Sequence, residues 1–398
     1  MWPENPLICQ LRKLCGSSKL FLVGGSVRDL LEDRVMKDYD FLIEGDVFNF
    51  ALGLAARLNC KMTLNRQLLT ASLETKWGTV DIACARRETY AYPGALPSVS
   101  PATWQEDLSR RDFTINALAV PLLKKGWGKL IDLSGGQKDI VGKLIRSMHE
   151  DSFQDDPTRM LRALRLKNRL VYRVEEKTFR CMQRDWKYLD CLSSARRFKE
   201  WVLLSAEAGL PEILRDLYEF GGWTKFLPVI SYTPGMTKYL SEIRIPEKTS
   251  GFRPWFLYLL VLLTLSQGDP DYFISAWELS AKDVTGLTGT LNLVRQKNLQ
   301  ALRKREQLSK MRKLPLEGLY LLYRQLFVDQ YTWDEFYRGV HFYKMPLDGQ
   351  DLMLLGLEPG PLLGMILERL EDSYEKEKFD KKEEGIELAK QLIKEETP

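Results

Sequence analysis

The chain has 398 residues and a formal net charge of +4, with 44% hydrophobic and 28% charged residues. This composition is typical of soluble globular proteins, the length predicts two to four packed units, and the mild charge permits a nucleic-acid partner without requiring one. The two histidines, His149 and His341, exclude a histidine-rich metal centre and argue against an attached phosphohydrolase domain of the HD type.

The cysteines and the apolar runs bear on the compartment. Six cysteines are scattered without Cys-x-x-Cys spacing, so we expect free thiols in a reducing cytoplasm. The longest apolar run, residues 255–265, is too short to span a bilayer and predicts a buried helix. We therefore expect a cytoplasmic protein without a membrane partner.

The first third of the chain alternates between strand and helix patterns. Helices are expected within residues 1–19 and over residues 47–58. Strands are expected at residues 20–23, 39–44, 61–63, 71–74 and 79–85. This alternation predicts an α/β unit with a small mixed sheet. Residues 89–103 are rich in Pro, Gly, Ser and Tyr and are expected to form a mobile loop.

The pattern changes after Gly135 and Gly136. Apolar residues then recur every three or four positions, which predicts helices for nearly all of the remaining chain. The expected fold class is therefore α/β followed by all-α. Residues 372–396 are dense in Lys and Glu and predict an exposed, charged final helix.

Two glycines and two aspartates lie near the start of the α/β unit. Gly24 and Gly25 follow the first strand, and a glycine turn there lets backbone amides approach an anion. Asp38 and Asp40 are two residues apart at the next strand, so their side chains should share one face. Two hard oxygen ligands at one point predict a magnesium site. A metal beside a phosphate-binding turn indicates nucleotidyl transfer, although either element alone is commonly an ordinary turn or strand end.

Two further side chains are candidates for the same site. Asp81 lies between apolar residues on a later strand and is a candidate third carboxylate; the alternative is a cap or an ion pair with Arg86 or Arg87. Arg28 lies one helical turn past the glycines and is a candidate phosphate ligand. For Arg28 the alternative is a surface ion pair with a nearby aspartate.

Arg110, Arg111 and Asp112 precede a second apolar run. Adjacent arginines repel one another unless an anion is close, so we expect a phosphate or carboxylate partner for them. The alternative is an ordinary helix N-terminus.

A basic helix is expected after Asp155 and Asp156. Pro157 suits the first helical turn, and acidic residues just before it are favoured by the helix dipole. Three arginines follow at steps of three residues: Arg159, Arg162 and Arg165. Such spacing places them on one helix face. The alternative is a basic face that is solvated or paired with acids.

Taken together, these segments resemble the class II tRNA nucleotidyltransferases (CCA-adding enzymes) and the related bacterial poly(A) polymerases, in the superfamily typified by DNA polymerase beta. The matching motifs are Gly-Gly-x-Val-Arg-Asp with a following Asp-x-Asp, Arg-Arg-Asp-Phe-Thr-x-Asn-Ala, and Glu-Asp-x-x-Arg with Asp155 in place of the glutamate. The resemblance covers residues 20–205. It implies a polymerase-beta-like nucleotidyltransferase head (1–139), a helical neck for base recognition (140–205), a helical body (206–310) and a helical, tRNA-binding tail (311–398).

The resemblance also implies roles for individual residues. The catalytic carboxylates would be Asp38, Asp40 and Asp81, with Mg²⁺ held by Asp38 and Asp40. The nucleotide-binding residues would be Gly24, Gly25, Arg28, Arg111, Asp112, Asp156, Arg159, Arg162 and Arg165. Within that set, Asp112 would contact the ribose hydroxyl, and Asp156 with Arg159 would read the edge of the base.

That base-reading assignment is chemically coherent. Cytosine and adenine each offer an amine donor beside a ring-nitrogen acceptor, which one carboxylate and one guanidinium are able to satisfy. Guanine and uracil present the wrong donor at that edge.

Two weaker features belong to the same resemblance. Residues 193–200 resemble a family motif that supports the base-reading helix, with Ala195 where glutamate is usual; the alternative is an amphipathic helix capped by Ser193 or Ser194. Residues 86–103 resemble a loop that family members use when they change from C to A addition.

The expected function is therefore a template-independent tRNA nucleotidyltransferase that builds or repairs the 3′-terminal CCA from CTP and ATP. An A-adding or CC-adding partial enzyme, a poly(A) polymerase and a catalytically silent RNA-binding protein stay as alternatives. The tRNA 3′ end is the expected macromolecular partner, and no protein partner is predicted. RNA contacts are expected in the helical half, where the basic run comprises Arg295, Lys297, Arg303, Lys304, Arg305, Lys310, Arg312 and Lys313.

Overall fold

The computed structural model of the chain describes residues 2–16, 18–36, 38–246, 251–266, 268–295, 304–342, 345–375 and 381–396. The chain divides into two compact units. The first comprises Met1–Arg244 and Ser275–Glu278, and the second Ile245–Ile274 and Leu279–Pro398. The expected head and neck both fall within the first unit, while the boundaries at residues 139, 205 and 310 stay predictions.

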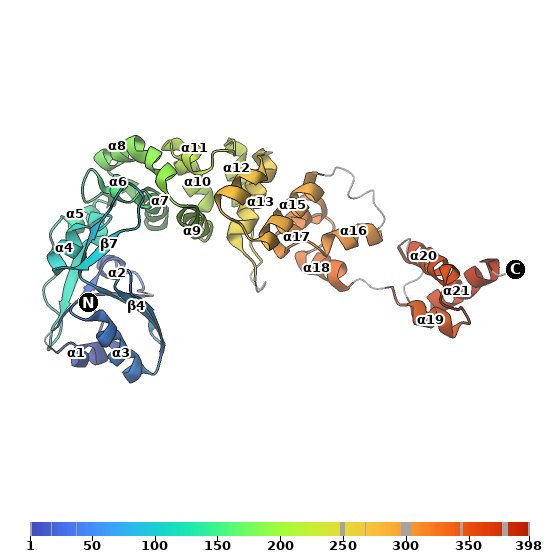
Figure 1. The fold of residues 1–398 in the computed structure, drawn as a ribbon, viewed down its shortest axis with the longest axis horizontal. Coiled ribbons are helices and arrows are strands. Elements are labelled where there is room, and N and C mark those ends of the chain that lie inside the picture. The colour runs from blue at the N-terminus through green and yellow to red at the C-terminus, as the bar shows by residue number, and fades with distance from the viewer. Residues whose placement is uncertain are drawn as a thin grey trace. The chain divides into compact units, whose positions relative to one another are not determined.

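The first unit contains all of the described strands (Figure 1). The strands are β1 (Lys19–Val23), β2 (Tyr39–Glu44), β3 (Lys61–Asn65), β4 (Thr70–Thr75), β5 (Gly78–Cys84), β6 (Arg86–Thr89), β7 (Ser98–Pro101), β8 (Leu118–Leu122), β9 (Ile131–Asp132), β10 (Leu144–Ile145) and β11 (Arg173–Val174). Its α-helices are α1 (Pro6–Leu14), α2 (Gly25–Leu31), α3 (Val47–Leu58), α4 (Trp104–Ser109), α5 (Gly136–Val141), α6 (Ser152–Asp155), α7 (Thr158–Leu170), α8 (Glu176–Asp185), α9 (Ser194–Ser205), α10 (Leu210–Glu219), α11 (Trp223–Phe226) and α12 (Pro234–Ser241). Two short 3₁₀ turns, η1 (Thr114–Asn116) and η2 (Trp186–Cys191), complete the unit.

The main sheet has seven strands in the order β3-β4-β5-β2-β1-β8-β9. Strands β2 and β5 are parallel, and the other neighbouring pairs are antiparallel. The predicted mixed sheet is therefore confirmed. Because β2 lies between β1 and β5, the two strands that carry the candidate aspartates are direct neighbours at the centre of the sheet.

The sheet is held by apolar residues on both of its faces. On one face, Phe21 and Val23 of β1 pack with Leu42 of β2 and with Leu108 of α4. Residues that alternate with these, such as Leu20 and Leu22, are also fully buried. Burial on both faces explains why these strands read as apolar runs rather than as an alternating pattern.

The segment expected to be a loop contains regular structure. Ser98–Pro101 pairs as an antiparallel strand with Arg86–Thr89, so β6 and β7 form a separate two-stranded sheet. Proline and glycine between residues 91 and 97 mark the turn of this hairpin. Because these residues are typical of loops, the sequence did not predict the strand that follows them. The prediction of an irregular loop over the whole of residues 89–103 was wrong.

The second unit is helical in the part of the chain that the structure describes. Its α-helices are α13 (Pro254–Ser266), most of α14 (Pro270–Ala276), α15 (Ala281–Arg295), α16 (Lys304–Met311), α17 (Leu316–Leu322), α18 (Trp333–Phe342), α19 (Gly349–Leu354), α20 (Pro361–Glu375) and α21 (Lys382–Glu396), with a π-helical turn η4 at Tyr323–Phe327. Helix α13 is buried as predicted, from Phe256 to Leu263. None of the described helices is long and apolar enough to cross a membrane.

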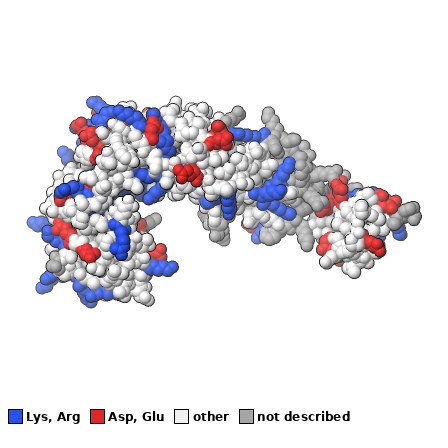
Figure 2. All heavy atoms as spheres, in the orientation of Figure 1, with Lys and Arg blue, Asp and Glu red and all other residues white. Residues whose placement is uncertain are grey.

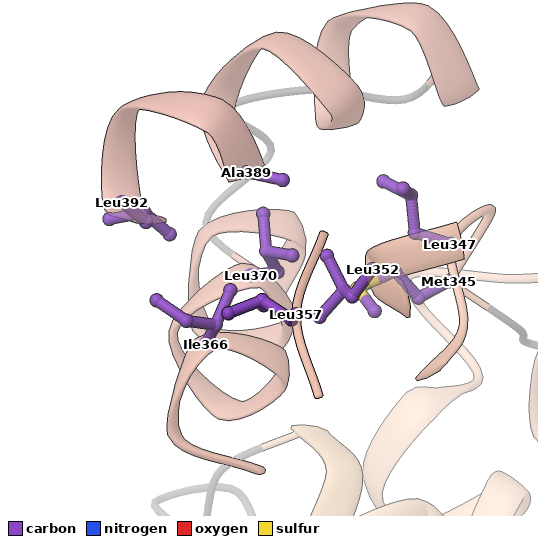
Figure 3. Close-up of a cluster of buried hydrophobic side chains, with 8 residues drawn as sticks. All are labelled: Met345, Leu347, Leu352, Leu357, Ile366, Leu370, Ala389 and Leu392. Carbon is purple, nitrogen blue, oxygen red and sulfur yellow. The ribbon is translucent and has the colours of Figure 1, made fainter. Parts of the chain in front are cut away.

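The last three helices enclose a hydrophobic cluster of their own (Figure 3). The cluster comprises Met345, Leu347, Leu352, Leu357, Ile366, Leu370, Ala389 and Leu392. Helix α21 contributes Ala389 and Leu392, so this charged helix is packed on one side rather than fully exposed.

Candidate functional site

Two cavities in the first unit meet at the centre of the sheet. The first has a volume of about 510 Å³ and the second about 780 Å³. Both are lined by Gly25, Asp40, Asp81, Asn116 and Arg162. The first cavity also includes Gly24, Arg110, Arg111, Asp112, Asp156 and Arg159, and the second includes Arg28, Asp38 and Arg165. Thus all of the predicted site residues line one or both of two adjoining cavities.

The carboxylates meet where the two parallel strands run side by side. Asp40 of β2 is paired in register with Asp81 of β5. Asp38 lies just before β2 and is exposed, and it lines the second cavity together with the other two carboxylates. Ser26 fixes this edge, because its hydroxyl donates to the Asp38 carbonyl at 3.1 Å and accepts the Asp40 amide at 2.9 Å. Arg86 and Arg87 do not take Asp81 as a partner, since they pair with Glu88 and Glu106.

The electrostatics of this pair suit a bound cation. Burial raises the pKa of Asp40, and the neighbouring charge of Asp81 raises it further. In the described part of the chain, no group of three or more His, Cys, Asp or Glu side chains is already gathered at metal-binding distance. A hard divalent cation is often held by only one or two carboxylates, with water and substrate phosphates as its other ligands. Asp40 and Asp81, with Asp38 beside them, are the residues able to hold such an ion.

The glycine turn brings backbone close to the carboxylates. Gly24 has a φ of +68°, and a β-carbon there would lie 3.0 Å from Nη1 of Arg111 and 3.7 Å from Oδ2 of Asp40. A β-carbon on Gly25 would also lie 3.7 Å from the same Asp40 oxygen. The amide of Gly24 is already used, because it donates to the Leu118 carbonyl at 3.2 Å. The backbone conformation therefore favours glycine at position 24, and a β-carbon there would also crowd the Arg111 guanidinium.

Arg28 is buried, and it forms the ion pair with a nearby aspartate that the alternative interpretation expected. It bonds to Asp29, and its Nη1 donates to Oδ1 of Asn116 at 2.7 Å. Asn116 in turn donates to Oδ1 of Asp112 at 3.1 Å, and its carbonyl accepts from Arg111 at 3.1 Å. Asn116 thereby connects three of the predicted nucleotide-binding residues.

Asp112 is a buried carboxylate with several donors. Nε of Arg162 lies 2.6 Å from its Oδ2, and Asn116 and the amide of Phe113 donate to Oδ1. Burial alone would raise the pKa of Asp112, but Arg162 and these hydrogen bonds outweigh it and hold the pKa below its ordinary value. Asp112 is thus a charged acceptor at the wall of the first cavity.

The two adjacent arginines share a carboxylate, as the sequence predicts. Asp107 of α4 is fully buried and accepts from Arg110 at 2.5 Å and from Arg111 at 3.1 Å. Helix α4 starts with a capping box formed by Thr103 and Glu106, which fixes the turn that presents Asp107. The partner of the arginines is therefore a protein carboxylate, and both guanidinium groups still line the first cavity.

Asp156 and Arg159, the predicted base-reading pair, lie at the junction of α6 and α7. Nη1 of Arg159 donates to Oγ of Ser152 at 2.7 Å, and its Nη2 donates to the Arg110 carbonyl at 3.0 Å. Oδ1 of Asp156 accepts from Thr158 and, at 2.6 Å, from Nη2 of Arg196. Each member of the pair is therefore held by a different anchor.

Arg196 also contacts the β6–β7 hairpin turn. Its Nη1 donates to the Gly94 carbonyl at 2.8 Å and to the Ala95 carbonyl at 3.3 Å. Ser193 caps α9 by accepting the amide of Arg196, so the capping alternative for this segment holds together with its contact to Asp156. Asp155 points elsewhere, with Oδ2 3.6 Å from Nε2 of His149.

Charges of both signs line the second cavity, where the carboxylates are those of Asp29, Asp38, Asp40 and Asp81. Five arginines line it: Arg28, Arg34, Arg162, Arg165 and Arg169. Arg165 and Arg169 are paired with Glu207, which limits their net charge. On the face seen in Figure 2, Lys and Arg side chains likewise have Asp and Glu side chains among them.

Several residues of the site carry no strong signal in the sequence. They are Ser26, Asp107, Asn116, Ser152 and Arg196, each of which holds a predicted site residue through a hydrogen bond or ion pair. Asn116 and Arg196 lie inside segments that resemble family motifs, and Asp107 directly follows the capping glutamate. Ser152 has no such context, because a lone serine before a helix is common.

The chain is similar to proteins of one family along nearly all of its length. Residues 20–146 match the model of the "Poly A polymerase head domain". The chain is 34% identical over 277 residues to an A-adding tRNA nucleotidyltransferase of Geobacter sulfurreducens, covering 66% of this chain and 31% of that protein. It is 44% identical over 160 residues to an A-adding tRNA nucleotidyltransferase of Halalkalibacterium halodurans, covering 40% of this chain and 38% of that protein. The chain thus spans only about a third of the length of these curated relatives.

Solved structures extend the similarity into the helical half. A CCA-adding enzyme in complex with CTP has a TM-score of 0.71 and 26% identity, covering 98% of this chain and 96% of that chain. The Thermotoga maritima CCA-adding enzyme in complex with tRNA has a TM-score of 0.66 and 26% identity, with the same coverage of 98% and 96%. The shared head, the motif residues gathered at one site and the similarity of the whole fold agree. In sequence and in fold, this chain is similar to the class II tRNA nucleotidyltransferase family.

Proposed function

We propose that this chain is a template-independent tRNA nucleotidyltransferase, which adds C, A or both to the tRNA 3′ end from CTP and ATP. The observation that carries the proposal is the first cavity. It joins the Asp40–Asp81 pair to Asp112 and to the Asp156–Arg159 pair, so one pocket combines carboxylates for a metal, a sugar contact and a base edge. Relatives named as A-adding and CCA-adding enzymes support the same activity.

Asp40 and Asp81, with Asp38, would hold Mg²⁺. When bound, Mg²⁺ supplies charge neutralisation for the triphosphate and activates the 3′-hydroxyl of the RNA. In the reaction the 3′-oxygen forms a bond to the α-phosphorus, and the bond from that phosphorus to the β-phosphate oxygen breaks to release pyrophosphate. The chain's part is to hold these groups in line: Gly24 leaves room for phosphate, and Arg28, Arg111, Arg162 and Arg165 offset its charge.

Asp112, Asp156 and Arg159 would select the nucleotide. A buried, charged Asp112 accepts a hydrogen bond from a ribose hydroxyl and is left unpaired by a deoxyribonucleotide. Asp156 accepts from the amine of cytosine or adenine while Arg159 donates to the adjacent ring nitrogen. No nucleic-acid template is required, because protein side chains supply the base pairing.

Addition of A to a tRNA that already ends in CC is the product that we favour. The relatives that are 34% and 44% identical to this chain are both named A-adding enzymes. The β6–β7 hairpin, which Arg196 ties to Asp156, supports A addition as well, since this is the segment linked by resemblance to the change from C to A. Complete CCA addition, CC addition and poly(A) synthesis are the competing products.

The helical parts would bind the tRNA. We propose residues 140–205 as the neck that presents the base-reading pair, residues 206–310 as the body and residues 311–398 as the tRNA-binding tail. Within the basic run proposed for RNA contacts, Lys297 and Arg303 lie outside the described residues, as do the side chains of Lys304 and Arg305. Arg295 and Arg312 donate to backbone carbonyls of their own unit, which makes them weaker candidates for phosphate contacts.

The test uses tRNAs that end at the discriminator base, at C or at CC, each incubated with CTP, ATP or both. A-only addition extends the CC-ending tRNA by a single A and leaves the other two unchanged. Complete CCA addition, CC-only addition and poly(A) synthesis each give a different set of extended tRNA products. Asp40→Asn serves as the inactive control, and absence of product from every wild-type reaction would overturn the proposal in favour of a silent RNA-binding protein.

A further inference from the structure

Ser152 contacts both members of the base-reading pair. Its side chain is fully buried at the first residue of α6. The Ser152 hydroxyl accepts from Nη1 of Arg159 at 2.7 Å, and the Ser152 carbonyl accepts the amide of Asp156 at 3.3 Å. The same carbonyl lies 3.5 Å from Nη1 of Arg159. Ser152 thus contacts the side chain of Arg159 and the backbone of Asp156.

The guanidinium of Arg159 depends on these contacts for its orientation. Arg159 is only 7% exposed, so its N–H groups need acceptors inside the protein or on a ligand. Ser152 and the Arg110 carbonyl each bind one terminal nitrogen. Among the described residues, Nε–H has no hydrogen-bond acceptor, and Arg159 lines the first cavity. Ser152 therefore holds one terminal nitrogen of the guanidinium, while Nε–H stays available as a donor.

We propose that Ser152 is a positioning residue that sets base choice, by holding Arg159 at a fixed distance from Asp156. This inference rests on the proposed function. The Asp156 carboxylate has other partners: Thr158 at the start of α7, and Arg196, which also contacts the turn of the β6–β7 hairpin. The guanidinium is thus anchored to α6 and to the Arg110 carbonyl, whereas the carboxylate is anchored to Thr158 and, through Arg196, to the hairpin turn. Loss of the Ser152 hydroxyl would then shift the guanidinium while the Asp156 carboxylate keeps its own partners.

The experiment measures kcat and KM for ATP, CTP, GTP and UTP on tRNAs ending at the discriminator base, at C or at CC. In Ser152→Ala, which removes one atom, discrimination against GTP and UTP should fall roughly tenfold or more, because a buried hydrogen bond to a charged group is lost. Ser152→Thr, which keeps the hydroxyl, should retain discrimination. Ser205→Ala is the matched control: Ser205 is also buried in a helix, and its hydroxyl donates to the Trp201 carbonyl rather than to a site residue.

A double-mutant cycle separates positioning from a general loss of structure. If Ser152 acts through Arg159, adding Ser152→Ala to Arg159→Ala should cause no further loss of discrimination. If Ser152→Ala does not fold, Ser152→Cys replaces it, since a thiol has similar size but is a weak acceptor. Unchanged base choice in the variant that folds, an equal effect of Ser205→Ala, or full additivity with Arg159→Ala would each overturn the inference. Failure of the wild-type protein to extend any tRNA would instead overturn the proposed function.

Discussion

Asp40 of β2 and Asp81 of β5 are partners in register on parallel strands, and the charge of Asp81 raises the pKa of Asp40 in addition to the effect of burial. Two carboxylates in this relationship repel one another when both are ionised. Arg111 and Arg162 offset part of this repulsion, and a cation bound between the carboxylates would offset more of it. Stability and catalysis are thereby opposed at this position.

The first prediction is that Asp40→Asn stabilises the protein when divalent cations are absent. A carboxyl whose pKa is raised in the folded state costs stability above that pKa, and the cost vanishes below the unfolded-state value near 3.8. At pH 7 the variant should therefore melt at a higher temperature than the wild type, by about 2–4 °C for each kcal/mol relieved. The difference should shrink as the pH falls through the raised pKa of Asp40.

Thermal melting from pH 4 to pH 8 in EDTA measures this effect, followed by a second series with Mg²⁺. Added Mg²⁺ should raise the melting temperature of the wild type and leave Asp40→Asn nearly unchanged. Glu74→Gln, which removes an exposed carboxylate on the adjacent strand β4, is the matched control and should show neither effect. Equal melting temperatures for Asp40→Asn and wild type at pH 7 would contradict this account.

The second prediction concerns Asp81. Asp81→Asn should lower nucleotide incorporation by roughly 100-fold or more, because one of the carboxylates proposed to hold the metal is lost, while RNA binding stays unchanged. The charge of Asp81 is one cause of the raised pKa of Asp40, so its removal should lower that pKa. The change of melting temperature with pH that Asp40 causes should therefore move to lower pH. Primer extension and melting on one preparation test both outcomes, with Glu74→Gln again as control. Near-wild-type activity would remove Asp81 from the catalytic set.

Much of the fold was predictable because its signals are local. Helix α3 begins after Asp46, whose side chain accepts two backbone amides, and is followed by Asn59 in the left-handed conformation. Both ends of the helix are therefore determined by residues next to them in the sequence. The central strands are apolar runs between turn residues. Strand β7 was missed because its pairing with β6 depends on backbone bonds across a turn, and its four residues carry no apolar pattern of their own.

The site was predictable only in part, for a related reason. Motif residues such as Asp40 and Arg111 are recognisable one segment at a time. Their anchors are not, because Arg28 meets Asn116 88 positions further along the chain and Arg196 meets Asp156 40 positions earlier. These contacts follow from the packing of whole elements, and a single segment does not encode them.

The third prediction separates crowding from backbone strain at Gly24. Gly24→Ala should weaken nucleotide binding and abolish activity, because a β-carbon would lie 3.0 Å from Nη1 of Arg111 within the site. Its positive φ should add a stability loss of about 1–2 kcal/mol.

Gly126 is the matched control, with a φ of +76° and no described atom within 4 Å of the position that a β-carbon would take. Gly126→Ala should show the stability loss and normal activity. Equal activities of the two variants, measured by ATP binding and primer extension, would refute the crowding argument.

The fourth prediction is that Arg196→Ala changes the choice between A and C more than it changes stability. Without Arg196 the Asp156 carboxylate loses a partner at 2.6 Å and its connection to the Gly94 carbonyl. We expect the kcat/KM for the preferred nucleotide to fall about 10- to 100-fold, with an altered ratio of kcat/KM between ATP and CTP and unchanged tRNA affinity.

The control is Arg180→Ala, which removes an exposed arginine paired with Glu176 on α8 and should change neither kcat/KM nor its ratio between the nucleotides. Single-nucleotide extension of a CC-ending tRNA provides the measurement. A loss of kcat/KM that is equal for both nucleotides would mean that Arg196 supports the helix but does not connect the hairpin to base choice.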